Sequence, residues 1–220
     1  MRPRLLDLFC GAGGAAVGYH RAGFDVVGVD INPQPNYPFE FHQADALAFP
    51  LDGFDAIHAS PPCQRYSDLA KRNGNGADWP DLVAPIRDRL AASALPWVIE
   101  NVEGAPLRDP IVLCGTMFPG LRVLRHRCFE SNVEMAAPAV HPRHPLVFTH
   151  DKRKRHYGQL DQDTAFVQVT GGGNATLTNK LDAMGTPWMA SHHEVNESIP
   201  PAYTEHIGTQ LLAHLEAVAA

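Results

Sequence analysis

The chain has 220 residues, of which 45% are hydrophobic, and a formal net charge of −6. This length supports one sizeable core with a modest appendage and leaves little room for two full domains. No apolar stretch approaches the roughly 20 residues that a membrane-spanning helix needs, and no signal peptide is visible. We therefore expect a cytoplasmic protein without a membrane partner. The four cysteines lack the spacing of metal fingers, so we expect reduced thiols and no metal.

A strand, a glycine-rich turn and a helix are predicted at the start of the chain. Residues 4–9 form a short apolar run, residues 10–14 read Cys-Gly-Ala-Gly-Gly, and residues 15–22 have a helical pattern. This order brings backbone close to a cofactor at the carboxyl end of a parallel strand, although dinucleotides, phosphates and other ligands all suit such a turn.

Two acidic residues follow at the ends of predicted strands. Residues 26–30 form a second strand that ends in Asp30, the position at which a ribose diol is usually bound. Asp45 follows another extended stretch, and its carboxylate would accept a hydrogen bond from an adenine amino group. Either acid alone would also serve as a helix cap or turn residue. Their order after the glycine turn predicts an adenosine-containing cofactor.

Residues 61–64, Pro-Pro-Cys-Gln, follow the apolar run 54–59. The two prolines fix their φ angles and stiffen the turn, so Cys63 is presented at one place. Only a thiolate attacks an electrophile, and a free cysteine titrates near a pKa of about 8.5, so such placement favours a nucleophile. An ordinary loop cysteine after a tight turn remains the alternative.

A carboxylate ends the next apolar run. A helix over residues 82–94 leads to the strand of residues 97–100, which ends in Glu100. Burial of an unpaired charge is costly, so Glu100 either lies outside the sheet and caps a turn or serves a function at the mouth of the sheet. In the second case it lies beside the strand that ends near Cys63.

Composition changes near Asn132, where prolines begin to interrupt regular structure. We therefore expect residues 1–131 and 181–220 to form the main domain and residues 132–180 to form a small irregular region. Residues 141–157 carry a local charge of +4, which suits a phosphate-contacting surface or a solvated loop. The four histidines of this stretch form no helical i, i+4 pair, so we expect no metal there. The glycine run 170–174 would either let the backbone approach nucleic acid closely or form a flexible turn.

Three ordered segments carry a resemblance to a known family. Residues 7–14, 61–64 and 100–102 resemble motifs I, IV and VI of the DNA (cytosine-5)-methyltransferases. Residues 124–129 resemble motif VIII, with Val123 at the usual glutamine position. The resemblance covers residues 4–130 well and the tail loosely, since residues 196–197 read Asn-Glu instead of the usual Gly-Asn. The compact, alanine- and proline-rich chain is similar to short phage-encoded members, which implies the cytoplasm of a bacterial or phage-infected cell.

The resemblance implies a reaction and a role for each matching residue. Cys63 would attack C6 of a flipped-out cytosine, Glu100 would hold the N3 and N4 edge, and Arg125 and Arg127 would steady the base or the loop. C5 would take a methyl group from S-adenosylmethionine, leaving S-adenosylhomocysteine. The implied cofactor-binding residues are Phe9, Gly11, Gly13, Gly14, Asp30, Ile31, Asp45, Pro61 and Ser198.

The implied partner is double-stranded DNA that contains the target cytosine, with no obligate protein partner. Residues 65–76 would close over the DNA, or else form an ordinary exposed connection. The predicted DNA-contacting residues are Gln64, Arg65, Ser67, Lys71, Arg72, Arg143, Lys152, Arg153, Lys154 and Arg155. The short region 132–180 predicts a target of about two to four base pairs.

The expected fold is an α/β, doubly wound, mostly parallel sheet of the Rossmann-like class I S-adenosylmethionine-dependent methyltransferase type, with the small irregular recognition region attached. Residues 205–219 form a last helix that returns to the main domain. Three functions remain open: an active DNA cytosine-5 methyltransferase, an enzyme on structured RNA or a free cytosine nucleotide, and a catalytically silent DNA-binding regulator.

Overall fold

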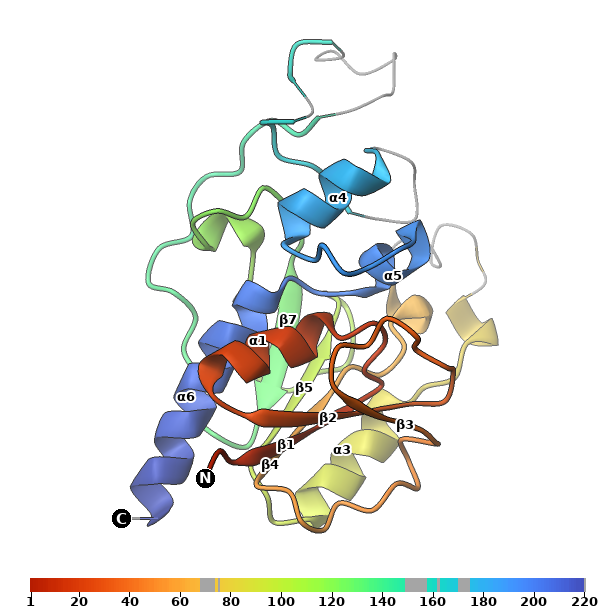
Figure 1. The fold of residues 1–220 in the computed structure, drawn as a ribbon, viewed down its shortest axis with the longest axis vertical. Coiled ribbons are helices and arrows are strands. Elements are labelled where there is room, and N and C mark those ends of the chain that lie inside the picture. The colour runs from red at the N-terminus through yellow and green to blue at the C-terminus, as the bar shows by residue number, and fades with distance from the viewer. Residues whose placement is uncertain (68–73, 75, 149–157, 162, 170–174, 220) are drawn as a thin grey trace.

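The computed structural model describes residues 1–67, 74, 76–148, 158–161, 163–169 and 175–219 (Figure 1). Its centre is a seven-stranded sheet with the order β3-β2-β1-β4-β5-β7-β6. The strands are β1 (Arg4–Leu8), β2 (Asp25–Asp30), β3 (Glu40–Gln43), β4 (Ala56–Ala59), β5 (Trp97–Asn101), β6 (Ile111–Leu113) and β7 (Arg127–Ser131). β1 to β5 pair in parallel, and β7 is antiparallel to both neighbours. The predicted mostly parallel sheet is confirmed.

Helices cover both faces of the sheet. The helices are α1 (Gly14–Ala22), α3 (Val83–Ala92), α4 (Leu177–Met184), α5 (His192–Glu197) and α6 (Pro201–Ala219). Successive residues of a strand point to opposite faces. Leu5 accordingly packs in the core that contains Tyr203 of α6, whereas Leu6 packs in the core that contains Ile86 of α3. The sheet is therefore doubly wound, as predicted.

The strand order reverses between β1 and β4. From β1 the chain builds outward through β2 and β3 before returning to β4 on the other side. The carboxyl ends of strands at such a reversal leave a crevice, which is the usual ligand position in open α/β sheets. Leu8 and Ala59 end these two strands, so the glycine turn and the Cys63 loop both leave the sheet at this crevice.

The second half of the chain is more regular than the sequence suggests. α4 begins at Leu177, so this helix crosses the predicted boundary at residue 180. α5 follows a capping box in which Ser191 and Glu194 satisfy each other's backbone amides. Neither helix is predicted above. The segment around Val167 pairs with Val123, so this part packs against the strand-bearing domain.

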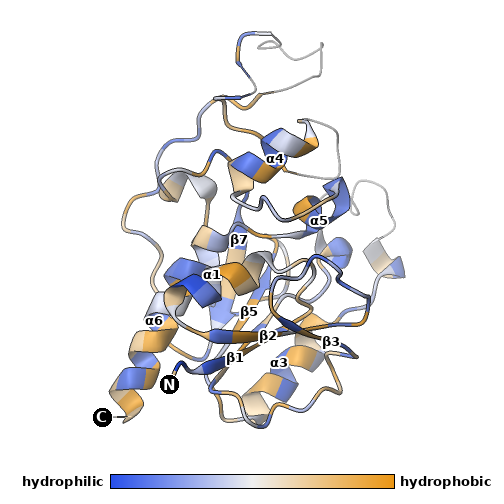
Figure 2. Ribbon diagram, in the orientation of Figure 1, coloured by the Kyte–Doolittle hydropathy of each residue, from blue (hydrophilic) through white to orange (hydrophobic). Residues whose placement is uncertain are grey.

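The last helix starts earlier than predicted, at Pro201, since proline is well suited to the first turn of a helix. Figure 2 shows that the labelled helices carry both hydrophilic and hydrophobic residues, as expected for helices with one buried face. Within the described ranges, no helix combines the length and the apolar character that crossing a membrane requires.

Candidate active site

A cavity of about 430 Å³ lies at the crevice between the carboxyl ends of the strands. Its wall includes the glycine turn and Asp30, and it also includes Cys63, Glu100 and Arg127. Most of the predicted cofactor residues therefore share one cavity with Cys63, Glu100 and Arg127, whereas Gly13, Asp45 and Arg125 are not part of its wall. Phe9, Ile31, Pro61 and Ser198 line it as well.

The glycine turn needs its glycines for two different reasons. Gly11 and Gly13 have φ angles of +48° and +83°, a region that side chains rarely adopt. Gly14 has no such φ, but a Cβ there would lie 1.9 Å from Oγ of Ser198. The turn thus sits directly against the tail that precedes α6. Phe9, also in the left-handed region at φ +59°, opens the turn.

Asp30 lies at the cavity wall beside the glycine turn. Its Oδ2 accepts a hydrogen bond from the amide of Gly11 at 3.1 Å, and its Oδ1 accepts one from the amide of Asn32 at 2.9 Å. These bonds hold the carboxylate at the cavity wall. The neighbouring Ile31 also lines the cavity and is 66% exposed.

Asp45 does not join this wall. It is exposed, and its Oδ1 accepts from the amide of Leu47 at 2.8 Å, so it caps the turn that follows β3. The expected contact of Asp45 with adenine is therefore not supported. Asp7 lines the cavity instead, although the sequence analysis gave it no role. Complete burial, reinforced by the charge of Asp30, holds the pKa of Asp7 well above its usual range.

The Cys63 loop is fixed to the neighbouring strand. The carbonyl of Pro61 accepts a hydrogen bond from Nδ2 of Asn101, the last residue of β5, at 2.9 Å. The carbonyl of Cys63 accepts one from the amide of Tyr66 at 3.0 Å within the short 3₁₀ helix η1 (Gln64–Tyr66). Cys63 itself is half-buried at the cavity wall.

Glu100 lies inside the sheet, so the alternative that it caps an exposed turn is wrong. It belongs to β5 and is 5% exposed. Nε of Arg127 lies 2.9 Å from its Oε1, and the hydroxyl of Ser60 forms a hydrogen bond with it. Ser60 Oγ is in turn 2.9 Å from Nε2 of the buried His58. The carboxylate is therefore held from two sides.

Burial sets the protonation of this group of side chains. It raises the pKa of the Cys63 thiol, while the positive charge of Arg127 acts in the opposite direction. It also raises the pKa of Glu100, again against the effect of Arg127. It lowers the pKa of His58 to about 3, which keeps this imidazole neutral. Arg127 thus favours the anionic forms of both the thiol and the carboxyl group.

Arg125 has a different position from the one expected. Its guanidinium donates to the carbonyl of Val169 and, at 2.6 Å, to the carbonyl of Asn196. Its own carbonyl accepts from the hydroxyl of Tyr203. Arg125 therefore connects its own backbone to the segments of Val169 and Asn196, and it does not line the cavity.

The predicted DNA-contacting residues have mixed positions. Gln64 lines the cavity and donates to Oε2 of Glu197 at 3.1 Å. Arg65 donates to the carbonyl of Trp79 at 2.9 Å, and Ser67 donates to the carbonyl of Gln64, so both hold their own loop. Arg143 is exposed. Lys71, Arg72, Lys152, Arg153, Lys154, Arg155 and the glycine run 170–174 lie outside the described residues.

Several residues at the cavity wall are not found by the sequence analysis. They come from the segment before α3 and from α5, neither of which carries a motif: Trp79, Pro80, His193 and Glu194. Glu197 was noted only as a departure from the last motif, yet it lines the cavity and its charge raises the pKa of Cys63. Only their tertiary placement identifies these residues.

A second cluster lies apart from the cavity wall. The structure brings together Cys114, His126, His141 and His144, whose potential ligand atoms lie within 4.8 Å of one another. Spacing in the sequence predicts no metal site here. It does not reveal the cluster, because His141 and His144 lie on an irregular segment that brings them next to Cys114 and His126.

Comparison with known proteins decides the family. The model of the C-5 cytosine-specific DNA methylases matches residues 3–109. The Type II methyltransferase M.HgiGI of Herpetosiphon aurantiacus is 32% identical over 120 residues, which cover 47% of this chain and 94% of that protein. The chain belongs to this methylase family. The Type II methyltransferase M.AquIA of Picosynechococcus is 32% identical over 126 residues, which cover 47% of this chain and 50% of that protein.

The methylase match covers only part of some relatives. It spans 38% of M.HgiDI, another Type II methyltransferase of Herpetosiphon aurantiacus, at 30% identity. Among solved structures, S. pombe Dnmt2 methyltransferase aligns with a TM-score of 0.60 and 15% identity over 98% of this chain and 99% of that chain. Entamoeba histolytica methyltransferase EhMeth aligns with a TM-score of 0.61 and 12% identity over the same shares. At these identities the structures establish the methyltransferase fold alone.

Proposed function

We propose that this family member is a DNA cytosine-5 methyltransferase that uses S-adenosylmethionine and attacks its target base through Cys63. The observation that carries the proposal is the single cavity described above. Its wall joins Asp30 and the glycine turn to Cys63, Glu100 and Arg127. A methyl donor and a base can therefore meet there without leaving the cavity.

The wall residues fit an adenosine-containing cofactor. Gly11 has open space where a Cβ would lie, so backbone can approach a ligand closely. Asp30 offers carboxylate oxygens suited to a ribose diol, and Ile31 offers an apolar surface suited to a ring. S-adenosylmethionine bound here would supply the methyl group.

The catalytic residues fit addition of a thiolate to a cytosine ring. Cys63 loses its proton to solvent, and the thiolate adds to C6, which turns C5 into a nucleophilic enamine carbon. Glu100, whose pKa burial raises, holds a proton at N3 and offsets the charge that develops in the ring. Once C5 is methylated, transfer of its proton to solvent and cleavage of the C6–S bond restore the aromatic ring and the thiolate. Arg127 stays beside Glu100 throughout.

Duplex DNA is the proposed substrate, and the cytosine must leave the base stack because Cys63 cannot reach a stacked base. The Type II names of the relatives suit this choice and suggest a role beside a restriction enzyme. Structured RNA is the second candidate, because the proposed recognition region of residues 132–180 is short. We also propose that the protein acts in the cytoplasm of a bacterial or phage-infected cell.

Methyl incorporation distinguishes these substrates. The purified protein is supplied with S-adenosylmethionine labelled in its methyl group and with duplex DNA, tRNA or dCMP. We expect label in duplex DNA only, complete loss in Cys63→Ser, and retention in Cys128→Ser, which alters a buried cysteine outside the cavity wall. Label confined to tRNA or dCMP would overturn the DNA assignment. Full activity of Cys63→Ser would overturn the assignment of Cys63 as the nucleophile.

A further inference from the structure

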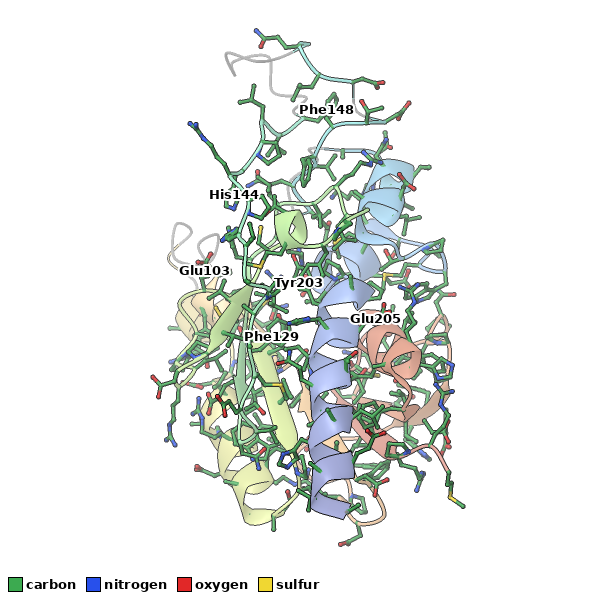
Figure 3. All side chains as sticks on the ribbon, turned by 90° about the vertical axis from the view of Figure 1, so that its left-hand side faces the viewer. Glu103, Phe129, His144, Phe148, Tyr203 and Glu205 are labelled. Carbon is green, nitrogen blue, oxygen red and sulfur yellow. The ribbon has the colours of Figure 1, made fainter. Side chains whose placement is uncertain are left out.

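Four potential metal ligands converge beside the strand β7 from separate parts of the chain. Cys114 directly follows β6, His126 directly precedes β7, and His141 and His144 belong to the extended segment after β7. Cys114 is fully buried, while His141 and His144 are exposed. Figure 3 shows His144 on this segment, above Glu103 in that view.

The four ligand atoms lie close enough together to surround one metal ion. Sγ of Cys114 lies 3.6 Å from Nε2 of His144, and Nε2 of His141 lies 3.0 Å from Nε2 of His144. Ligand atoms around tetrahedral zinc lie about 3.3–3.6 Å apart, given Zn–N and Zn–S bonds of about 2.0–2.3 Å, so the first separation agrees and the second is somewhat shorter. His126 completes the group, since all four ligand atoms lie within 4.8 Å of one another.

Polar neighbours support the ligands in the manner of a second layer around a metal. The hydroxyl of Thr116 donates to Sγ of Cys114 at 3.4 Å. Oε2 of Glu103 lies 3.6 Å from Nδ1 of His126. Hydrogen bonds to a ligating sulfur and carboxylates beside a ligating imidazole are typical of outer partners at metal sites, where they orient the ligands and tune their basicity.

The segment that carries His141 and His144 is anchored at Ala136 by Gln210 and at Phe148 by Phe166, and the two histidines lie in the span between these anchors. Residues 136–146 form neither helix nor strand, and His141 and His144 are exposed. Fixing the backbone of each residue costs about 1–2 kcal/mol in conformational entropy. Contacts among three imidazole rings and a thiol offset little of that cost in water. Coordination of a metal ion offsets it directly, since binding energy at such sites becomes folding energy.

We propose that Cys114, His126, His141 and His144 bind one zinc ion. A thiolate with three imidazoles suits zinc, and four protein ligands close the tetrahedron without leaving a position for substrate. The ion is therefore structural. Binding releases the thiol proton of Cys114 to solvent, while the imidazoles bind in their neutral form.

The zinc ion would connect the proposed recognition region to the active site. Through Cys114 and His126, it ties residues 141–144 to the strand pair β6 and β7. His126 lies between Arg125 and Arg127 in the sequence. Arg127 contacts Glu100, and Arg125 holds the carbonyl of Val169. The site would thus set the position of the extended segment relative to the catalytic strands. The proposal does not depend on the methylation chemistry.

Metal analysis of the whole chain tests this proposal. The protein is purified without a histidine tag, incubated with zinc and passed through gel filtration before elemental analysis. We expect one zinc per chain in the wild type and in the matched controls Cys128→Ser and His192→Ala, which alter another buried cysteine and an exposed histidine. Cys114→Ser and His144→Ala should bind at least about 100-fold more weakly.

Cobalt(II) provides a second measurement that does not depend on activity. The wild type should show the thiolate charge-transfer band and the intense visible bands of a tetrahedral site, and Cys114→Ser should lose both. Glu103→Gln, an exposed change that keeps all four ligands, should weaken zinc binding by about 10–100-fold. A folded wild type that binds no zinc would overturn the proposal, as would a Cys114→Ser variant that binds zinc as tightly as the wild type.

Discussion

Cys63 and Cys114 lie in two regions that assemble their side chains in different ways. Cys63 has neighbours contributed by the ends of adjacent parallel strands, so strand order alone brings Glu100 and the glycine turn to it. Cys114 has neighbours contributed by a strand end and an irregular segment, so no periodic pattern in the sequence predicts them. Sites at the carboxyl edge of a sheet can be predicted from sequence, whereas sites built by irregular segments require the structure.

The short segment from Arg125 to Arg127 belongs to both regions. Arg127 contacts Glu100, His126 joins the cluster of Cys114, and Arg125 holds the backbone of Val169 and Asn196. Substitutions at the cavity should therefore change the chemistry of the site without changing the metal content of the protein.

Glu100→Gln should reduce the rate of methyl transfer by about 10²–10⁴-fold, the usual contribution of a positioned proton donor. The amide keeps the shape of the side chain but cannot hold the proton at N3. Turnover is measured with saturating S-adenosylmethionine and DNA, and zinc content should stay at the wild-type level. Glu134→Gln, an exposed change, is the control and should retain full activity. Wild-type turnover of Glu100→Gln would contradict the role of Glu100.

Gly14→Ala should destabilise the fold by about 1–3 kcal/mol, as overpacking generally does. Its Cβ would lie 1.9 Å from Oγ of Ser198 and 2.5 Å from the carbonyl oxygen of Ile199. The tail must then move away from the glycine turn, so affinity for S-adenosylmethionine should fall as well. Urea unfolding and calorimetric titration measure the two effects. Ser198→Ala removes the hydroxyl without adding a clash and should change both far less.

His58→Gln should remove part of the pH dependence of stability. Burial lowers the pKa of His58 to about 3 from its usual 6.5, so below pH 6.5 the unfolded chain binds a proton that the folded chain does not. The free energy of unfolding of the wild type therefore falls as the pH drops from 6.5 towards 3. Between pH 7 and pH 5 the wild type should lose about 2 kcal/mol more than the variant.

Urea unfolding at both pH values gives this difference. The buried carboxyl groups Asp7 and Glu100, whose pKa values are raised, are present in both proteins and cancel in the comparison. His192→Gln, which alters an exposed histidine, should keep the wild-type slope. Equal slopes for the wild type and His58→Gln would show that His58 binds protons equally in the folded and unfolded states, and that burial does not lower its pKa.

Arg127→Gln should raise the pKa of Cys63 further, because Arg127 is the main group that favours the thiolate. Alkylation by iodoacetamide at a fixed pH below that pKa should become about tenfold slower for each unit by which the pKa rises. Arg108→Gln, an exposed change, is the matched control. An unchanged alkylation rate would exclude this electrostatic coupling, and loss of zinc from Arg127→Gln would contradict the separation of the two regions.

Much of the fold follows from local patterns. The apolar runs that end in Asp30, near Cys63 and at Glu100 correspond to β2, β4 and β5, and all three lie in a parallel arrangement. Their carboxyl ends must therefore meet at one edge. For the same reason, the sequence predicts that Asp30, Cys63 and Glu100 belong to one site, and all three line the cavity.

The remaining features depend on long-range packing. Asp45 follows a predicted strand as Asp30 does, but its carboxylate caps a turn and does not line the cavity. Arg125 and Arg127 are two residues apart, yet only Arg127 reaches Glu100. Glu197 and Trp79 reach the cavity wall from segments without any motif. Sequence spacing contains none of this information.

The most direct test of the proposed function is nucleoside mass spectrometry of DNA from a host that lacks 5-methylcytosine. The host expresses either the wild-type chain or Cys63→Ala, with Cys128→Ser as a control for loss of a cysteine. We predict 5-methyldeoxycytidine with the wild type and Cys128→Ser, and none with Cys63→Ala. If the folded wild-type protein binds S-adenosylmethionine but leaves host DNA without 5-methyldeoxycytidine, DNA methylation is contradicted.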